Sequence, residues 1–97
     1  MPTYVSLINW TEQGIRTVRD TLNRRGQTEA LAEKHGVRLE QVYWTVGPYD
    51  VVAILEAPDD ESATAMLLEL GSAGNLRTTT LRAYDDEAMS GIIQRLG

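Results

Sequence analysis

Six aromatic and polar residues stand at or beside the ends of apolar stretches in this sequence. They are Asn9, Trp10, Tyr43, Trp44, Tyr49 and Asp50. Aromatic walls with a few polar anchors are typical of pockets that hold small organic molecules. We therefore expect these residues to line a ligand-binding pocket between a sheet and the first helix, with Asn9 and Asp50 orienting the ligand.

Some of these groups could also take part in catalysis. Asp50, or the single histidine His35, would shuttle a proton, and the side-chain amide of Asn9 would stabilise an oxyanion. Each has a structural alternative. Asp50 can accept hydrogen bonds from turn amides, His35 stands where a helix end favours a cation, and the tryptophans can fill a core or an interface. The sequence has no evident nucleophile and base pair, which favours binding over catalysis.

No metal or cofactor is expected. The chain has one histidine and no cysteine, and it lacks a phosphate-binding glycine loop and a dinucleotide fingerprint. The carboxylates at residues 59–61 are the residue type expected at the start of a helix.

Basic residues concentrate on the first helix, at Arg16, Arg19, Arg24 and Arg25. They are interpreted as a solvated helix face, with the steering of an anionic ligand or of a partner as the alternative.

Hydrophobic periodicity predicts the elements that position these residues. Four strands are expected, over residues 3–9, 37–46, 50–57 and 76–83. Helices are expected after the first, third and fourth strands, beginning at Thr11, at the acidic residues 59–61 and at Asp85. The first of these helices is interrupted at residues 24–26 and ends near Gly36.

This order of elements predicts an α+β protein, a ferredoxin-like βαββαβ sandwich with an extra C-terminal helix. Right-handed crossovers place the first and third strands in the centre of the sheet. The helices cover one face only, yet the third strand is apolar on both, with Val51, Ala53 and Leu55 on one face and Val52 and Ile54 on the other. We therefore expect a second copy of the chain to cover the free face, giving a homodimer or a higher homo-oligomer.

Four stretches of the sequence resemble the GYD domain family, small proteins of largely unassigned function. They are Tyr-Val-Ser-Leu-Ile-Asn-Trp-Thr, Val-Tyr-Trp-Thr-Val-Gly-Pro-Tyr-Asp-Val-Val, Glu-Ala-Pro-Asp-Asp and Gly-Asn-Leu-Arg-Thr-Thr-Thr-Leu-Arg-Ala. Pro48 splits the Gly-Tyr-Asp triplet that names the family. The resemblance implies one GYD-type domain over residues 1–97 and a dimeric α/β barrel, in which two ferredoxin-like sheets pack face to face.

Relatives of that architecture include cofactor-free monooxygenases, lactone isomerases, haem enzymes and amino-acid-sensing regulatory domains. The fold alone therefore does not select a function. We expect a protein that binds or senses a small organic molecule. The alternative is a cofactor-independent oxygenase or isomerase that acts on a small aromatic or lactone-like substrate.

The charge of the chain argues against two classes of partner. Its 97 residues carry a formal net charge of −5 at pH 7, whereas binding to nucleic acid or to an anionic membrane relies on dense Lys and Arg. No apolar run approaches the ~20 residues of a membrane span. The chain lacks cysteine, and its amino terminus lacks a basic region followed by an apolar stretch. Both features fit a cytoplasmic protein.

Overall fold

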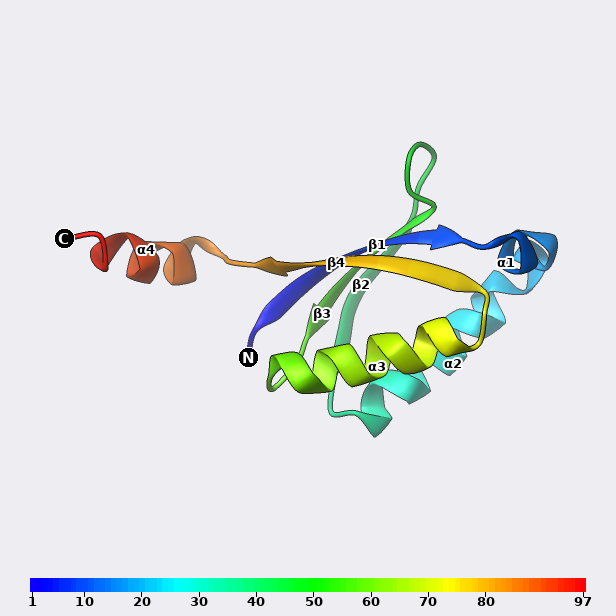
Figure 1. Ribbon diagram of the computed structural model, residues 1–97, viewed down its shortest axis with the longest axis horizontal. Helices are drawn as coiled ribbons and strands as arrows, with labels where there is room; N and C mark the ends of the chain where they lie inside the picture. The colour runs from blue at the N-terminus through cyan, green and yellow to red at the C-terminus, as the bar shows by residue number, and fades with distance from the viewer.

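The computed structural model describes residues 1–97 and has one four-stranded antiparallel sheet with helices (Figure 1). In chain order the elements are β1 (Thr3–Trp10), α1 (Glu12–Arg16), the 3-10 helix η1 (Val18–Asp20), α2 (Thr21–Lys34), β2 (Arg38–Trp44), β3 (Val51–Glu56), α3 (Asp60–Ser72), β4 (Leu76–Ala83) and α4 (Asp86–Gln94). The predicted α+β, ferredoxin-like fold with an extra C-terminal helix is confirmed.

The strands lie in the order β2-β3-β1-β4, so β1 and β3 are central, as predicted. Every neighbouring pair is antiparallel. Helices α2 and α3 lie on one side of the sheet, whereas α4 extends beyond the end of β4, away from the other helices (Figure 1). The sheet therefore has a helix-covered face and an open face without a helix.

The core lies under the helix-covered face and is built by alternate residues of the central strands. In register, Tyr4, Ser6 and Ile8 of β1 lie opposite Leu55, Ala53 and Val51 of β3, and all six are buried. Because successive strand residues point to opposite faces, one residue in two enters the core. Ala63 and Met66 of α3 are buried in the same cluster, which fixes α3 against the sheet.

Tyr4 joins the core to the start of α3. Its hydroxyl donates a hydrogen bond to the carboxylate of Asp60. Burial, and then this hydrogen bond, favour the neutral phenol and raise the pKa of Tyr4 to about 12. The guanidinium of Arg82 lies 5.6 Å from the centre of the Tyr4 ring. The carboxylate and the guanidinium therefore both lie against one buried phenol.

Side-chain caps begin three of the helices. The side chains of Thr11, Asp59 and Asp85 accept hydrogen bonds from the backbone N–H groups of Gly14, Ser62 and Ala88. Each cap pairs an N–H group that has no partner within its helix and stabilises the helix by ~1 kcal/mol. The predicted caps at Thr11 and Asp85 are confirmed.

None of the helices combines the length and the apolar character needed to cross a membrane.

The helical region after β1 differs from the prediction. Helix α2 runs through the expected break at residues 24–26. Gly26 is exposed, and a Cβ atom added there would have no neighbour within 4 Å, so it costs the helix only ~1 kcal/mol relative to alanine. The break falls instead at Thr17, which ends α1 with φ −113° and ψ 29°. Strands β2 and β3 are also shorter than predicted, leaving residues 45–50 as the hairpin loop.

The open face of the sheet carries apolar side chains from all four strands. By register, this face includes Val5, Leu7, Tyr43, Val52, Ile54 and Leu81. Tyr43 and Leu81 are exposed, and the other four are half-buried. A large part of the apolar surface of the sheet is therefore in contact with solvent in a single chain.

Candidate functional site

A cavity of about 60 Å³ lies between the helix-covered face of the sheet and α2. Nine of its thirteen lining residues are hydrophobic: Ile8, Trp10, Leu39, Val42, Trp44, Val51, Ala53, Leu70 and Leu76. Most of them belong to the strands, because the helix-facing positions of a sheet that packs on helices are apolar. An apolar floor of this kind favours a ligand that buries a hydrocarbon group.

The polar lining comes from α2 alone. It consists of Thr21, Arg24, Arg25 and Thr28. These four positions follow the spacing i, i+3, i+4 and i+7, so they share one face of the helix. All four are half-buried, whereas Leu22 between them is exposed. The helix therefore places threonine and arginine residues along the cavity, at positions where an amphipathic helix ordinarily places apolar side chains.

The two tryptophans form walls of the cavity. The indole N–H of Trp44 donates a hydrogen bond to the Thr21 hydroxyl, with the two atoms 3.0 Å apart. This bond joins the last residue of β2 to the first residue of α2. It fixes the orientation of one indole at the edge of the cavity, where Trp44 is 41% exposed and within reach of a ligand.

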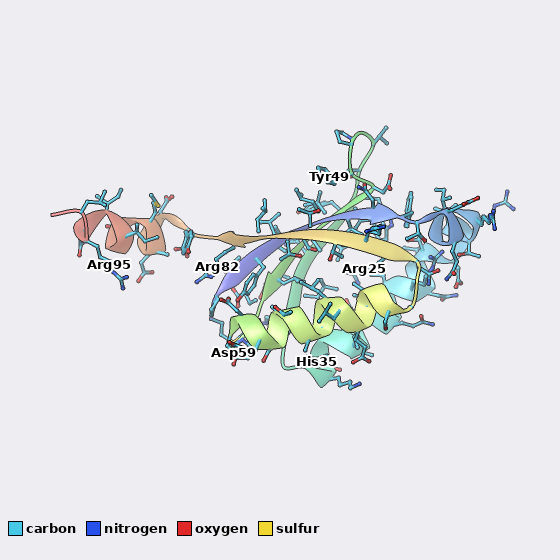
Figure 2. The ribbon with its side chains drawn as sticks, in the orientation of Figure 1. Arg25, His35, Tyr49, Asp59, Arg82 and Arg95 are labelled. Atoms are coloured by element: carbon cyan, nitrogen blue, oxygen red, sulfur yellow. The ribbon has the colours of Figure 1, made fainter.

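The structure does not bring all six predicted pocket residues to this cavity. Trp10 and Trp44 line it. Asn9 and Tyr43 lie on the open face, because they pair in register with Arg77 and Val52. The remaining two, Tyr49 and Asp50, are in the hairpin loop, and Figure 2 shows Tyr49 on the other side of β1 and β4 from α2 and α3.

Asp50 attaches the hairpin loop to the end of β1. One carboxylate oxygen accepts a hydrogen bond from the backbone N–H of Trp10 at 2.9 Å, and the backbone N–H of Asp50 donates to the carbonyl of Ile8 at 2.9 Å. The amide that binds the carboxylate therefore belongs to β1 and not to the turn itself. Since Trp10 and Ile8 both line the cavity, this pair of bonds holds part of the cavity wall in place.

We predict that Asp50→Asn lowers the free energy of unfolding by ~1 kcal/mol, because a neutral amide oxygen replaces a charged acceptor for the Trp10 amide. Asp50→Ala removes the acceptor and should cost more. Urea denaturation followed by tryptophan fluorescence would measure both variants. Equal stability of all three proteins would contradict the scaffolding role.

His35 lies at the C-terminal end of α2, in the position that the helix-end interpretation predicts. Its Nε2 lies 2.9 Å from a carboxylate oxygen of Glu69, which also accepts hydrogen bonds from Lys34 at 3.0 Å. Hydrogen bonds from His35 and then from Lys34 stabilise the charged carboxylate and lower the pKa of Glu69. These bonds join α2 to α3. His35 does not line the cavity, and it lies on a different element from Asn9 and Asp50.

The sequence interpretation misses the contribution of α2 to the cavity. It assigns the basic residues of this region to a solvated face, and that assignment holds for Arg16 and Arg19, which are exposed. Arg24 and Arg25 instead line the cavity. The spacing of Thr21, Arg24, Arg25 and Thr28 carries a signal in the sequence, because these positions fall on one face of an uninterrupted helix.

The sheet order and the helices packed on one face define the class of protein, which is the ferredoxin-like α+β domain. The chain belongs to the GYD domain family, whose sequence pattern it matches over residues 4–93. The resemblance seen in the sequence is therefore confirmed.

Three known proteins are similar to the chain. A Thermus thermophilus protein named glutamine synthetase and cystathionine beta-lyase binding protein is 34% identical over 84 residues, which cover 86% of this chain and 88% of that protein. The crystal structure of TTHA0845 from Thermus thermophilus aligns with a TM-score of 0.55 and 26% identity, over 88% of this chain and 95% of the other.

The crystal structure of MtbAldR aligns with a TM-score of 0.67 and 14% identity over 88% of this chain. The aligned region covers 52% of the MtbAldR chain, so the present chain spans about half the length of that protein. At this level of identity the likeness shows the fold alone.

Proposed function

We propose that this chain is a non-catalytic binding protein that holds a small organic molecule in the cavity between the sheet and α2. The observation that carries the proposal is the lining of that cavity, an apolar floor with two indole walls and a polar stripe on one helix. Few and clustered polar groups in an apolar hollow are typical of small-molecule sites. Binding there would change the packing of α2 against the sheet and could be sensed by a partner.

A second copy of the chain is the proposed cover for the open face of the sheet. Val5, Leu7, Val52 and Ile54 form an apolar strip along its two central strands, and sheet-to-sheet packing would remove this strip from water. The projecting helix α4 and the residues just after it have exposed apolar side chains, including Met89, Ile93 and Leu96. We propose that this helix packs on the second copy in a dimeric α/β barrel.

The relative named for binding glutamine synthetase and cystathionine beta-lyase supports a more general property. We propose that this chain also has protein partners, without assigning either of those enzymes to it. A dimer that binds a metabolite and contacts a second protein would fit a sensing function. The ligand would then alter the shape or the stability of the surface that the partner contacts.

The alternative, a cofactor-independent oxygenase or isomerase, has less support. The polar residues of the cavity lining are two threonines and two arginines, and a guanidinium remains protonated in proteins and cannot accept a proton. Asp50, the carboxylate expected to shuttle a proton, accepts a backbone hydrogen bond from Trp10 instead. The arrangement favours holding a ligand over transforming it.

The proposed site can be tested with single-ring aromatic fragments, namely phenol, benzamide and phenylacetate, at millimolar concentration. We expect at least one of them to shift the indole N–H resonances of Trp10 and Trp44 in a proton–nitrogen correlation spectrum, because both rings line the cavity. Thr28→Phe fills the cavity from α2 and should abolish the shifts. The control Thr64→Phe, at an exposed position of α3, should retain them. Unchanged indole resonances with every fragment would contradict the proposal.

A further inference from the structure

We propose that the ligand of this cavity is an organic monoanion, a carboxylate attached to an apolar group of about one ring. This inference rests on the proposed binding function and adds the chemical class of the ligand. It follows from the two arginines of α2, Arg24 and Arg25, that line an otherwise apolar cavity. Figure 2 shows Arg25 on the helix-covered side of the sheet.

The position of these arginines is unusual for their helix. Helix α2 buries the face that contains Thr21, Arg24, Arg25 and Thr28 and exposes Leu22. Exchange of these residue types would bury more apolar surface and leave the charges in water, so packing alone does not favour the observed order. Departures of this kind from the expected pattern are concentrated at functional sites.

Arg24 is held in place by backbone and hydroxyl oxygens. Its Nη2 donates to the carbonyl of Gly14 at 3.3 Å, to the Thr17 hydroxyl at 2.8 Å and to the Thr17 carbonyl. All three bonds use the same nitrogen, and no carboxylate lies within salt-bridge distance of this guanidinium. A guanidinium has five N–H donors, so Arg24 retains donors for an anion while its position is fixed.

Arg25 has a weakly held partner. Its Nη1 donates to Glu29 at 2.6 Å, and the two side chains are 36% and 51% exposed. An ion pair exposed to this extent contributes at most ~1 kcal/mol. A ligand carboxylate can therefore replace Glu29, or it can bind the nitrogen atoms of Arg25 that this pair leaves free. A carboxylate that accepts two parallel hydrogen bonds from a guanidinium forms one of the stronger polar contacts in proteins.

The rest of the cavity determines the other end of the ligand. The indoles of Trp10 and Trp44 and the side chains of Ile8 and Val51 offer mainly apolar surface, which suits an aromatic or branched aliphatic group. The volume of about 60 Å³ is below the ~150 Å³ of a cavity that holds benzene, so the apolar group is no larger than one ring and part of it stays at the open edge beside Trp44. A neutral ligand would gain less from the charge of the arginines than an anion would, and a fully polar anion such as phosphate would bury no apolar surface against the indole rings.

Phenylacetate and its amide, phenylacetamide, test the inference, because they match in shape and differ in charge. Titrations followed by the indole resonances of Trp10 and Trp44 should give a dissociation constant at least about tenfold lower for phenylacetate, as expected for charge-assisted hydrogen bonds. In Arg25→Gln the two constants should become nearly equal. The matched control is Arg16→Gln, which removes a similar arginine, paired with Glu12 at 2.7 Å and absent from the cavity lining, and should keep the preference.

The outcomes distinguish the two proposals. Equal affinity of the wild-type protein for both compounds, with indole shifts present, would overturn the monoanion assignment and leave the small-molecule site intact. Loss of the preference in both Arg16→Gln and Arg25→Gln would also overturn it, because the effect would then come from the overall charge of the protein. Absence of indole shifts with both compounds would overturn the monoanion assignment, and absence of shifts with phenol and benzamide as well would overturn the small-molecule site. If the correlation spectrum of Arg25→Gln resembles that of the wild-type protein, the variant is folded, and lost binding is not caused by unfolding.

Discussion

Replacement of Gly14 by alanine is expected to lower the free energy of unfolding by at least ~2 kcal/mol. A Cβ atom on Gly14 would lie 2.0 Å from the backbone carbonyl oxygen of Asn75, a distance that forces the backbone to move. The same oxygen accepts a hydrogen bond from the backbone N–H of Thr11 at 3.1 Å. The substitution would therefore separate α1 from the segment before β4 and weaken this bond too.

Gly26→Ala is the matched control for this prediction. Gly26 also lies in a helix, but a Cβ there has no other atom within 4 Å, so alanine should raise the free energy of unfolding by about 0.5–1 kcal/mol through helix propensity. Urea denaturation of the three proteins at one protein concentration would give both differences. Similar stability changes in the two variants would contradict the close approach of α1 and Asn75.

Substitution of Val52 by aspartate is expected to convert the proposed dimer into a folded monomer. Val52 lies on β3 on the open face, opposite Leu7 and Tyr43, and in the single chain it is only half-buried. A carboxylate at this position can remain hydrated in the monomer, whereas it would be buried without a partner in a sheet-to-sheet interface. Light scattering should give a mass near the 10.8 kDa of one chain with an unchanged far-UV circular dichroism spectrum.

Ala53→Asp provides the contrast, because the next residue of β3 points to the opposite face. Ala53 is 4% exposed within the core, so an aspartate there should unfold the chain and not merely dissociate it. A wild-type protein that is monomeric at micromolar concentration would refute the proposed dimer. A Val52→Asp variant that remains dimeric would place the interface elsewhere.

Much of the fold can be predicted because its signals are local. The caps at Thr11 and Asp85 are single side chains whose effect does not depend on distant residues, and both lie at the predicted positions. The central places of β1 and β3 follow from the rule for crossover handedness. The continuity of α2 through Gly26 differs from the prediction, because the contacts of the whole helix with β2 and α3 outweigh a weak preference of one residue.

The candidate site is predicted only in part, for a geometric reason. Asn9 and Trp10 are neighbours in one strand, and so are Tyr43 and Trp44. Neighbours in a strand face opposite sides of the sheet, so a pocket on one face can include only one residue of each pair. The alternation is visible in the sequence. The packing of α2 decides which face of the sheet is covered by helices. It also decides that Arg24 and Arg25 line the cavity on that face.

The projection of α4 from the end of β4 affects how the protein diffuses in solution. The single chain measures 52 × 30 × 18 Å, and its radius of gyration is 14.6 Å, against about 12.5 Å for an average compact domain of this length. Such an elongated shape has a high frictional ratio, so a monomer elutes from a sizing column earlier than a compact protein of the same mass. A mass calculated from the elution volume alone would therefore be too high. A dimer in which α4 lies along the second copy would have a lower frictional ratio than the isolated chain, and sedimentation velocity would record this difference.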